Sequence, residues 1–414
     1  MRKLLILGSM DEFCALVEHA KARGIYTVVC DGYAHGPAKA IADEAYDIDP
    51  RKTDEIADLC MRLGIDAAFG TFSDLLAECL VDICYKAGLP CYAEPERFAT
   101  LREKTKMKRM FEELGVPTPA AVQVHRESIA RDIAGLHPPF VMKPVNGYGS
   151  RGVYVVNSVE EIAERFEETI SYSSFDHLIV EEYSDGHEFN MMNWILDGEP
   201  ITLSVADREK THEDPFAVPH VSRIVYPSRF TDDVLAEARE IVRKVAAHVG
   251  IETGPLCMQF FWSPESGLKV CECAGRIFGY EHELLELSGG PSLEELILDH
   301  LFDREALAGR LHDHDPHLAG FAAGLYFHGR EGEVGDVSMA EALVDDPAVV
   351  DALVYYARGE RISHGVGAKP YAVRYYLKAA SRAELDEATE RIYDACRVLD
   401  GAGVDLLLPN RLEA

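Results

Sequence analysis

The sequence predicts a mixed α/β and α+β protein in three consecutive parts. Residues 1–95 alternate short apolar strands with helices, and this βαβ rhythm is typical of a parallel sheet. Residues 138–156 place two runs rich in valine and aromatic residues on either side of a glycine-rich loop, which predicts a β-hairpin. From about residue 318 a new series of strands and helices begins, which predicts a small α+β subdomain.

Length and charge narrow the range of functions. The chain has 414 residues, of which 47% are hydrophobic, so it can bury a substantial core and hold two or three domains. Its net charge of −30, with a sequence pI of about 4.9, repels nucleic acids and anionic membrane surfaces. We therefore expect no nucleic-acid or membrane partner, and an anionic small substrate needs local positive charge in its site.

The ten cysteines show no disulfide or zinc framework. No C-x-x-C motif occurs, and Cys271 and Cys273 are too close in the sequence for a standard zinc pair. We interpret the cysteines as reduced thiols, most of them in the core of a cytoplasmic protein. The apolar run at residues 4–7 is shorter than the core of a signal peptide, and no run has the length of a membrane helix.

Turn residues divide the N-terminal part into elements. Strands are expected at residues 4–7, 26–30, 45–48 and 67–69, and helices at 12–23, 53–63 and 74–86. Gly8 and Asp31 follow two of these strands, at positions where a parallel sheet can bind a nucleotide. Such lone residues are weak signals, so a purely structural domain is the favoured interpretation.

The glycine-rich loop at residues 147–152 reads as G-x-G-x-x-G, the pattern of dinucleotide-binding turns. That turn requires a helix directly after the loop, whereas here a strand is expected at 153–156. Glycines still let backbone N–H groups approach phosphate oxygens, and Lys143 would place a cation beside them. By itself this stretch fits a phosphate-binding hairpin and a mobile surface hairpin about equally.

The remaining elements follow from the same signals. Ser158 and Glu161 form a capping-box pattern at the start of a helix. Residues 205–228 are polar and irregular, which predicts a functional lid or a disordered insert. Further helices are expected at 95–113, 158–169, 232–248, 283–287, 293–302, 340–344 and 381–399, and strands at 178–180, 187–196, 256–262, 268–273, 319–327, 352–356 and 371–379.

Four motifs in order resemble the ATP-grasp superfamily, above all its carboxylate–amine ligases and the related carbamoyl-phosphate synthetase and biotin carboxylase folds. The motifs are Glu-Lys at 103–104 before Gly-Val-Pro at 115–117, Val-Met-Lys-Pro at 141–144 with the hairpin, residues 179–188, and Met-Gln-Phe-Phe at 258–261 followed by residues 270–276. The resemblance implies a two-lobed ATP-grasp domain at 96–310, with a lid lobe at about 115–185. It would lie between an N-terminal domain at 1–95 and a C-terminal subdomain at 311–414.

The resemblance also implies which residues bind ATP. Lys104 and Lys143 would contact the phosphates, and the loop that contains Gly147, Tyr148, Gly149 and Ser150 would close over them. Glu181, Glu182 and Tyr183 would receive adenine, largely through backbone groups, and the Glu188 carboxylate would bind the ribose hydroxyls. The alternatives are ordinary surface lysines and, for Glu182, a solvated side chain.

Gln259 and Glu272 lie on adjacent predicted antiparallel strands and alternate with apolar neighbours, so both side chains can point into one cleft. In the family this pair holds Mg²⁺, which favours oxygen ligands. The family usually has an asparagine two residues after the glutamate, but this chain has Ala274. One or two Mg²⁺ ions, with Mn²⁺ as a substitute, are therefore expected, and a chance placement of either side chain is the alternative.

Two arginines complete the implied site. Arg276 resembles the arginine that steadies the transferred phosphoryl group, with an ordinary ion pair as the alternative. Arg223, in the polar stretch, is a second phosphate-contacting candidate. Tyr280, Glu281 and His282 either line the substrate pocket or have local roles at a helix start. The histidine-rich segment at 312–317 resembles a metal site in composition only, because it lies in a predicted exposed linker.

The resemblance implies an ATP-dependent ligase that joins a small-molecule carboxylate to an amine through an acyl phosphate and releases ADP and phosphate. A bicarbonate-activating carboxylase is one rival, although no biotin-carrier segment is evident. A regulatory protein that binds ATP without catalysis is another, and Ala274 favours it. The family also suggests a homodimer.

Overall fold

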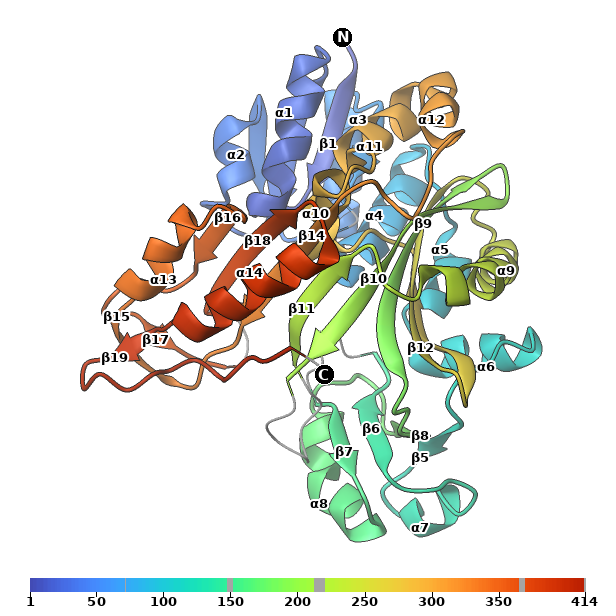
Figure 1. Cartoon of the computed structure of the whole chain (residues 1–414). Helices are drawn as coiled ribbons and strands as arrows, with labels where there is room; N and C mark the ends of the chain where they lie inside the picture. Colours follow the sequence, from blue (N-terminus) through green and yellow to red (C-terminus); the bar gives the residue numbers. More distant parts are fainter. Residues whose placement is uncertain (71, 147–151, 212–219, 365–368, 413–414) are drawn as a thin grey trace.

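The computed structural model describes residues 1–70, 72–146, 152–211, 220–364 and 369–412, and leaves out the side chain of Tyr280. The N-terminal domain lies at one end of the molecule, above a long twisted sheet (Figure 1). A small lobe that contains β5 to β8 lies at the other end, and the C-terminal strands extend the long sheet to one side. No described helix is both long and apolar enough to cross a lipid bilayer.

The N-terminal domain contains the predicted parallel sheet. Its strand order is β3-β2-β1-β4, formed by β1 (Lys3–Leu7), β2 (Tyr26–Asp31), β3 (Glu44–Asp47) and β4 (Ala67–Phe69). Helices α1 (Cys14–Ala22), α2 (Pro37–Ile41), α3 (Thr53–Leu63) and α4 (Asp74–Ala87) connect and cover the strands. Residues 4–7 are completely buried, as expected for a parallel strand with both faces covered.

The small lobe is an antiparallel sheet with the strand order β5-β8-β6-β7. Its strands are β5 (Ala121–Val124), β6 (Phe140–Pro144), β7 (Tyr154–Val156) and β8 (Leu178–Glu182), so the predicted hairpin is confirmed as β6 and β7. Helices α7 (Ile129–Asp132) and α8 (Val159–Ile170) pack against it. Ser158 caps α8 by accepting a hydrogen bond from the Glu161 N–H, at 3.2 Å.

The long sheet has eight strands in the order β13-β12-β9-β10-β11-β14-β18-β16. They are β9 (His187–Leu196), β10 (Glu199–Lys210), β11 (Val221–Tyr226), β12 (Gly254–Ser263), β13 (Gly267–Ala274), β14 (Phe321–Phe327), β16 (Val349–Val354) and β18 (Val373–Ala379). Antiparallel pairing of β11 with β14 makes the sheet continuous across residue 311. The proposed division of the chain at that residue stays a prediction.

The prediction of an irregular stretch at 205–228 is wrong for its described residues, most of which lie in β10 and β11. Their charged side chains are buried against partners from distant segments, which the local sequence does not reveal. Arg382 on α14 (Arg382–Ala395) contacts Asp207 at 2.9 Å and Glu209 at 2.8 Å. The charged residues of β10 are therefore held by ion pairs to α14, next to buried apolar residues of the same strand such as Leu203 and Val205.

The other elements are shorter or lie at the edges of these sheets. The predicted helix at 381–399 ends earlier, at Ala395, because β19 (Leu399–Asp400) pairs with β15 (Gly332–Asp336). The remaining helices are α5 (Pro95–Phe98), α6 (Lys104–Glu113), α9 (Thr231–Val249), α10 (His282–Leu287), α11 (Leu293–Phe302), α12 (Arg304–Leu311) and α13 (Ser338–Ala342), with β17 (Arg361–Ile362) as a further strand.

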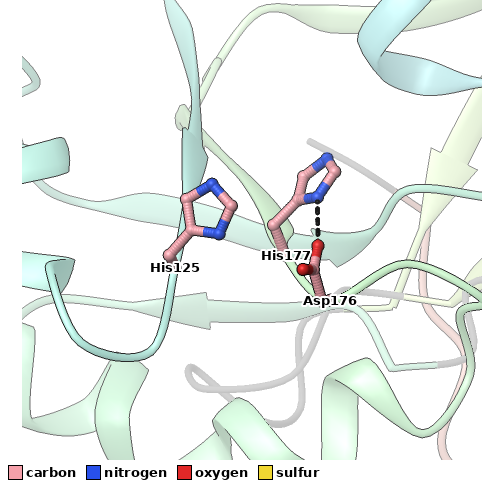
Figure 2. A group of neighbouring side chains, drawn as sticks. All are labelled: His125, Asp176 and His177. Atoms are coloured by element: carbon pink, nitrogen blue, oxygen red, sulfur yellow. Dashed lines mark hydrogen bonds and ion pairs between the residues drawn. The ribbon is translucent and has the colours of Figure 1, made fainter.

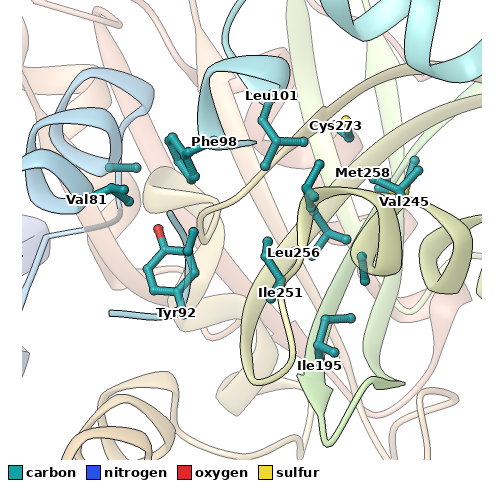
Figure 3. Packing of buried hydrophobic residues seen from close by; sticks show 14 of the residues in the cluster. Val81, Tyr92, Phe98, Leu101, Ile195, Val245, Ile251, Leu256, Met258 and Cys273 are labelled. Atoms are coloured by element: carbon teal, nitrogen blue, oxygen red, sulfur yellow. The ribbon is translucent and has the colours of Figure 1, made fainter. Parts of the chain in front are cut away.

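The N-terminal domain and the long sheet share one hydrophobic core (Figure 3). Val81 on α4 and Phe98 on α5 lie on one side of this core, while Leu256 and Met258 on β12 and Val245 on α9 lie on the other. All five side chains are buried. Because the two parts share this core, the N-terminal domain packs against the sheet. It lies next to the end of β13.

His282, at the start of α10, provides a polar connection inside this junction. Its Nε2 lies 3.0 Å from Glu294 Oε1, and its ring stacks on Phe72 with ring centroids 4.7 Å apart. Burial lowers the pKa of His282, but the neighbouring carboxylates of Glu283 and Glu294 outweigh burial and raise it to about 9. These contacts agree with the local role that the sequence left open for His282.

We predict that His282→Gln makes the stability of the protein less dependent on alkaline pH. The raised pKa of His282 means that its ion pair stabilises the fold fully below about pH 6.5, and that this contribution is lost as the pH rises through about 9. The free energy of unfolding of the wild type should therefore exceed that of the variant at pH 6, and this difference should shrink by up to about 3 kcal/mol between pH 6 and pH 10.

Thermal unfolding of both proteins between pH 6 and 10 measures this difference. His312→Gln is the control, because His312 is largely exposed and its ring contacts the neighbouring Asp313. A wild-type advantage that stays constant or grows with pH would contradict the assignment.

Candidate active site

One face of the long sheet gathers polar side chains from four adjacent strands. Cross-strand register places Asn190 opposite Gln259 and Gln259 opposite Glu272, and Arg208 reaches Glu188 just beyond the last pair of the β9–β10 ladder. Directly opposed residues in antiparallel strands share a face of the sheet. The alternation of side chains along each strand therefore brings these groups together.

Glu188 is the most crowded of these groups. It is buried, accepts a hydrogen bond from Arg208 Nε at 2.7 Å and from the Gln259 amide, and is paired with Lys210. Burial raises the pKa of Glu188, but the charges of Lys210 and Arg208 outweigh it and lower the pKa. The carboxylate is therefore ionised, and its contact with a ribose stays a prediction.

Gln259 and Glu272 face one another across β12 and β13, as their strand positions predict. The Glu272 side chain is exposed, and it makes no hydrogen bond or ion pair with the part of the chain that the structure describes. Gln259 is half-buried and uses its amide nitrogen toward Glu188. A free carboxylate beside an amide oxygen fits Mg²⁺, which combines few protein ligands with phosphate oxygens and water.

Lys143 and Lys108 share one carboxylate at the edge of the small lobe. Lys143 Nζ lies 2.5 Å from Glu181 Oε1, and Lys108 Nζ lies 2.9 Å from Glu181 Oε2. Burial raises the pKa of Glu181, but the two ammonium groups outweigh burial and lower it to about 2. Lys108 was missed in the sequence, although it is four residues after Lys104 and so on the same face of α6.

Lys104 begins α6 and connects it to the small lobe, because its backbone N–H donates to the Val145 carbonyl at 3.0 Å. Burial lowers the pKa of Lys104, and the nearby charge of Lys143 lowers it further, while Glu272 opposes both. The structure thus brings Lys104 and Lys143 near each other and near Glu272. Two ammonium groups beside a carboxylate form a site suited to a polyanion.

Glu182 and Tyr183 lie at the end of β8, where the resemblance places adenine. The Glu182 carboxylate accepts hydrogen bonds from the backbone N–H and the Nδ1 of His137, at 3.0 and 2.9 Å. The Glu182 and Tyr183 N–H groups already donate to the carbonyls of Ala120 and Pro139. An adenine here would meet carbonyl oxygens or replace these bonds, and its contact with Glu181, Glu182 and Tyr183 stays a prediction.

Arg276 forms a bidentate ion pair with Asp74 at the start of α4. The two contacts are Nε to Oδ1 at 2.7 Å and Nη2 to Oδ2 at 3.1 Å. Burial lowers the pKa of Arg276, but Asp74 outweighs it and the net shift is upward. The ion pair that the sequence analysis gave as the alternative role of Arg276 is therefore present. Contact of Arg276 with a phosphoryl group stays a prediction.

The structure does not bring Arg223 to this face. Arg223 pairs in register with Glu209, which alternates with Arg208 and so lies on the opposite face of the sheet. Its guanidinium is buried between Glu209 Oε2 at 3.3 Å and Asp386 Oδ1 at 2.6 Å. Within the described ranges no contact joins Arg223 to the polar face, so its contact with a phosphate and its catalytic role stay predictions.

Glu281 joins the polar face from the loop after β13. It is buried and accepts hydrogen bonds from Asn190 Nδ2 at 2.5 Å and the Tyr226 hydroxyl at 2.8 Å. Burial is the largest cause of its raised pKa.

Two sets of predicted residues lie elsewhere. Gly147, Tyr148, Gly149 and Ser150 fall outside the described residues. In the histidine-rich segment, His312 contacts Asp313, His314 reaches the Leu203 carbonyl, and His317 contacts Asp232 and Asp315. The three histidines therefore have separate partners and do not converge on one point.

Comparisons with known proteins identify the domain in which most of these residues lie. Residues 136–282 match the family model described as "ATP-grasp domain". A D-alanine–D-alanine ligase of Wolbachia pipientis is 27% identical over 156 residues, which cover 36% of this chain and 47% of the ligase. The chain covers between 40% and 47% of the length of the first three curated relatives that it matches.

Solved structures show the same fold over almost the whole chain. The L-amino acid ligase from Bacillus licheniformis has a TM-score of 0.79 and 16% identity, covering 97% of this chain and 99% of the ligase. The biotin carboxylase domain of the Hydrogenobacter thermophilus 2-oxoglutarate carboxylase has a TM-score of 0.73 and 18% identity, covering 95% and 89%. These two matches show a shared fold, and the family model identifies an ATP-grasp domain at residues 136–282.

Proposed function

We propose that the chain is an ATP-dependent carboxylate–amine ligase that forms an amide or peptide-like bond. The observation that carries the proposal is the position of Glu272, whose free carboxylate lies opposite Gln259 and near Lys104 and Lys143. Two neighbouring lysines alone are common in proteins. An exposed carboxylate next to such lysines suits phosphates that are bound together with a metal ion.

The proposed reaction has two steps. A substrate carboxylate oxygen attacks the γ-phosphorus of ATP, and ADP leaves, which gives an acyl phosphate. The amine then attacks the acyl carbon, and phosphate leaves as the amide forms. Lys104 and Lys143 would neutralise the charge of the phosphoryl oxygens, and Arg276 would do so if it exchanges Asp74 for the phosphoryl group.

The proposed cofactors are ATP and Mg²⁺. The biotin carboxylase domain named above was solved with MgADP, ADP and bicarbonate, which supports a magnesium nucleotide in this fold. Mg²⁺ would be held by Glu272 and Gln259 and would offset phosphate charge. Ala274 offers no side-chain oxygen, so a single ion, or a second one completed by water or substrate, is the proposed arrangement; Mn²⁺ would substitute. A homodimer is proposed by analogy with the same solved dimer.

The reaction class is tested by measuring products with MgATP and a panel of substrates. We expect release of ADP and phosphate that depends on a pair of amino acids or a related acid and amine, together with a new amide detected by mass spectrometry. Turnover that depends on bicarbonate would favour a carboxylase. Tight ATP binding without turnover on any substrate would favour a regulatory protein, and AMP with pyrophosphate as products would exclude the acyl phosphate.

Glu272→Ala should lower ADP release by roughly 100- to 1,000-fold, because it removes the carboxylate proposed to hold Mg²⁺ next to the phosphates. Glu265→Ala is the matched control, since Glu265 is exposed in the turn between the same two strands. The rate and its dependence on Mg²⁺ concentration are measured for both variants. Full activity of Glu272→Ala at low Mg²⁺ would refute the metal role.

Lys104→Ala should raise the KM for MgATP and lower turnover, while Lys106→Ala should resemble the wild type. Both lysines lie in the first turn of α6, but Lys106 is more than half exposed and pairs with Glu103 at 2.9 Å. Loss of one ammonium group beside the phosphates is expected to cost roughly 100-fold in turnover per KM. Equal effects of the two substitutions in steady-state kinetics would contradict a phosphate contact by Lys104.

A further inference from the structure

A second group of ligand-type side chains lies in the small lobe, away from Gln259 and Glu272. His125 follows β5, and Asp176 and His177 precede β8 (Figure 2). Val124 is paired with Leu178, so the next pair of the antiparallel ladder places His125 directly opposite His177. Their imidazole rings have centroids 5.3 Å apart. The register of two strands therefore holds two imidazoles side by side.

Asp176 brings a carboxylate to the same point. Its Oδ1 lies 3.1 Å from His177 Nδ1, and the Asp176 side chain is otherwise exposed. One ligand atom from each of the three residues lies within 4.8 Å of the others.

These distances suit a small transition-metal ion. Zn²⁺ binds histidine nitrogen and carboxylate oxygen at about 2.0–2.2 Å, which places two ligands of a tetrahedral ion about 3.3 Å apart. The His177 Nδ1 to Asp176 Oδ1 separation of 3.1 Å already matches that value. The ion would replace the proton shared by these two atoms, and rotation of the half-buried His125 ring would bring the third ligand into range.

The segment that carries Asp176 and His177 is fixed before any ion binds. Ser173 Oγ donates to Asn146 Oδ1 at 3.0 Å, and Asn146 Nδ2 donates to Ser174 Oγ at 2.9 Å. The His177 side chain is only 13% exposed, so its ring has little freedom to turn away. A site with restrained ligands loses less conformational entropy on binding.

We propose that His125, Asp176 and His177 form a binding site for a divalent transition metal of the Zn²⁺ type. Two imidazoles and one carboxylate favour such an ion over Mg²⁺, which prefers oxygen ligands alone. Three protein ligands leave one position for water. The ion would join β5 to the segment before β8 and stabilise the small lobe, independently of the proposed ligase reaction.

The test is an isothermal calorimetric titration, in which ZnCl₂ is added to the metal-free full chain in the presence of excess MgCl₂. We expect one Zn²⁺ per chain, and at least tenfold weaker binding in His125→Gln and in His177→Gln. His137→Gln is the matched control, because His137 lies in the same lobe and its side chain is 88% exposed. Thermal unfolding without metal identifies any variant that fails to fold, and for such a variant Asp176→Asn replaces it.

Two further readouts separate this site from others on the chain. Zn²⁺ should raise the unfolding temperature of the wild type and of His137→Gln but not of the site variants. Co²⁺ should give a visible spectrum without a thiolate charge-transfer band, because the proposed ligands include no cysteine. Unchanged Zn²⁺ affinity in both histidine variants, a thiolate band, or no stoichiometric binding would each overturn the proposal.

Discussion

The pairing of Glu181 with two lysines is the interaction on which the candidate site depends. A buried ammonium group costs several kcal/mol unless an opposite charge meets it. Glu181 on β8 meets Lys143 on β6 and Lys108 on α6, so one carboxylate joins the small lobe to the helix that also carries Lys104. In a chain with a net charge of −30, this arrangement keeps cations at the one place where an anion is proposed to bind.

The same need for partners of opposite charge applies in the long sheet, which carries a separate network of charged residues on each of its two faces. Arg208 and Lys210 point to the face that carries Glu188, whereas the alternating residues Asp207 and Glu209 point to α14. Every one of these charges has a partner of opposite sign. Residues 207–210 of β10 are therefore charged because they contact two different partners. One face of the strand holds the C-terminal helix, and the other faces the proposed nucleotide.

The N-terminal domain contributes a wall of the site. Asp74 at the start of α4 holds Arg276, and the Tyr92 hydroxyl donates to the Gly275 carbonyl at 2.6 Å. Both contacts fix the loop that follows Glu272. The N-terminal domain therefore positions the segment that carries Arg276, and its purely structural role stays a prediction.

Sequence alone determined the features that depend on local pattern. Strand and helix periodicity predicted the parallel sheet, the β6–β7 hairpin and the cross-strand pairing of Gln259 with Glu272, because these follow from neighbours within a few residues. The spacing of four motifs was enough to indicate the superfamily. The helical spacing of four residues between Lys104 and Lys108 also places both lysines on one face of α6, although the sequence analysis did not select Lys108.

Only the tertiary structure decided which charges meet. Arg276 and Asp74 are separated by about 200 residues, Arg223 and Asp386 by more than 160, and His125 and His177 by about 50. Ion pairs are chosen by the packing of whole elements, so no local pattern reveals that Arg223 points away from Glu188 or that two histidines face one another. The physical reason is that chain periodicity sets the face of each side chain, whereas folding sets what that face meets.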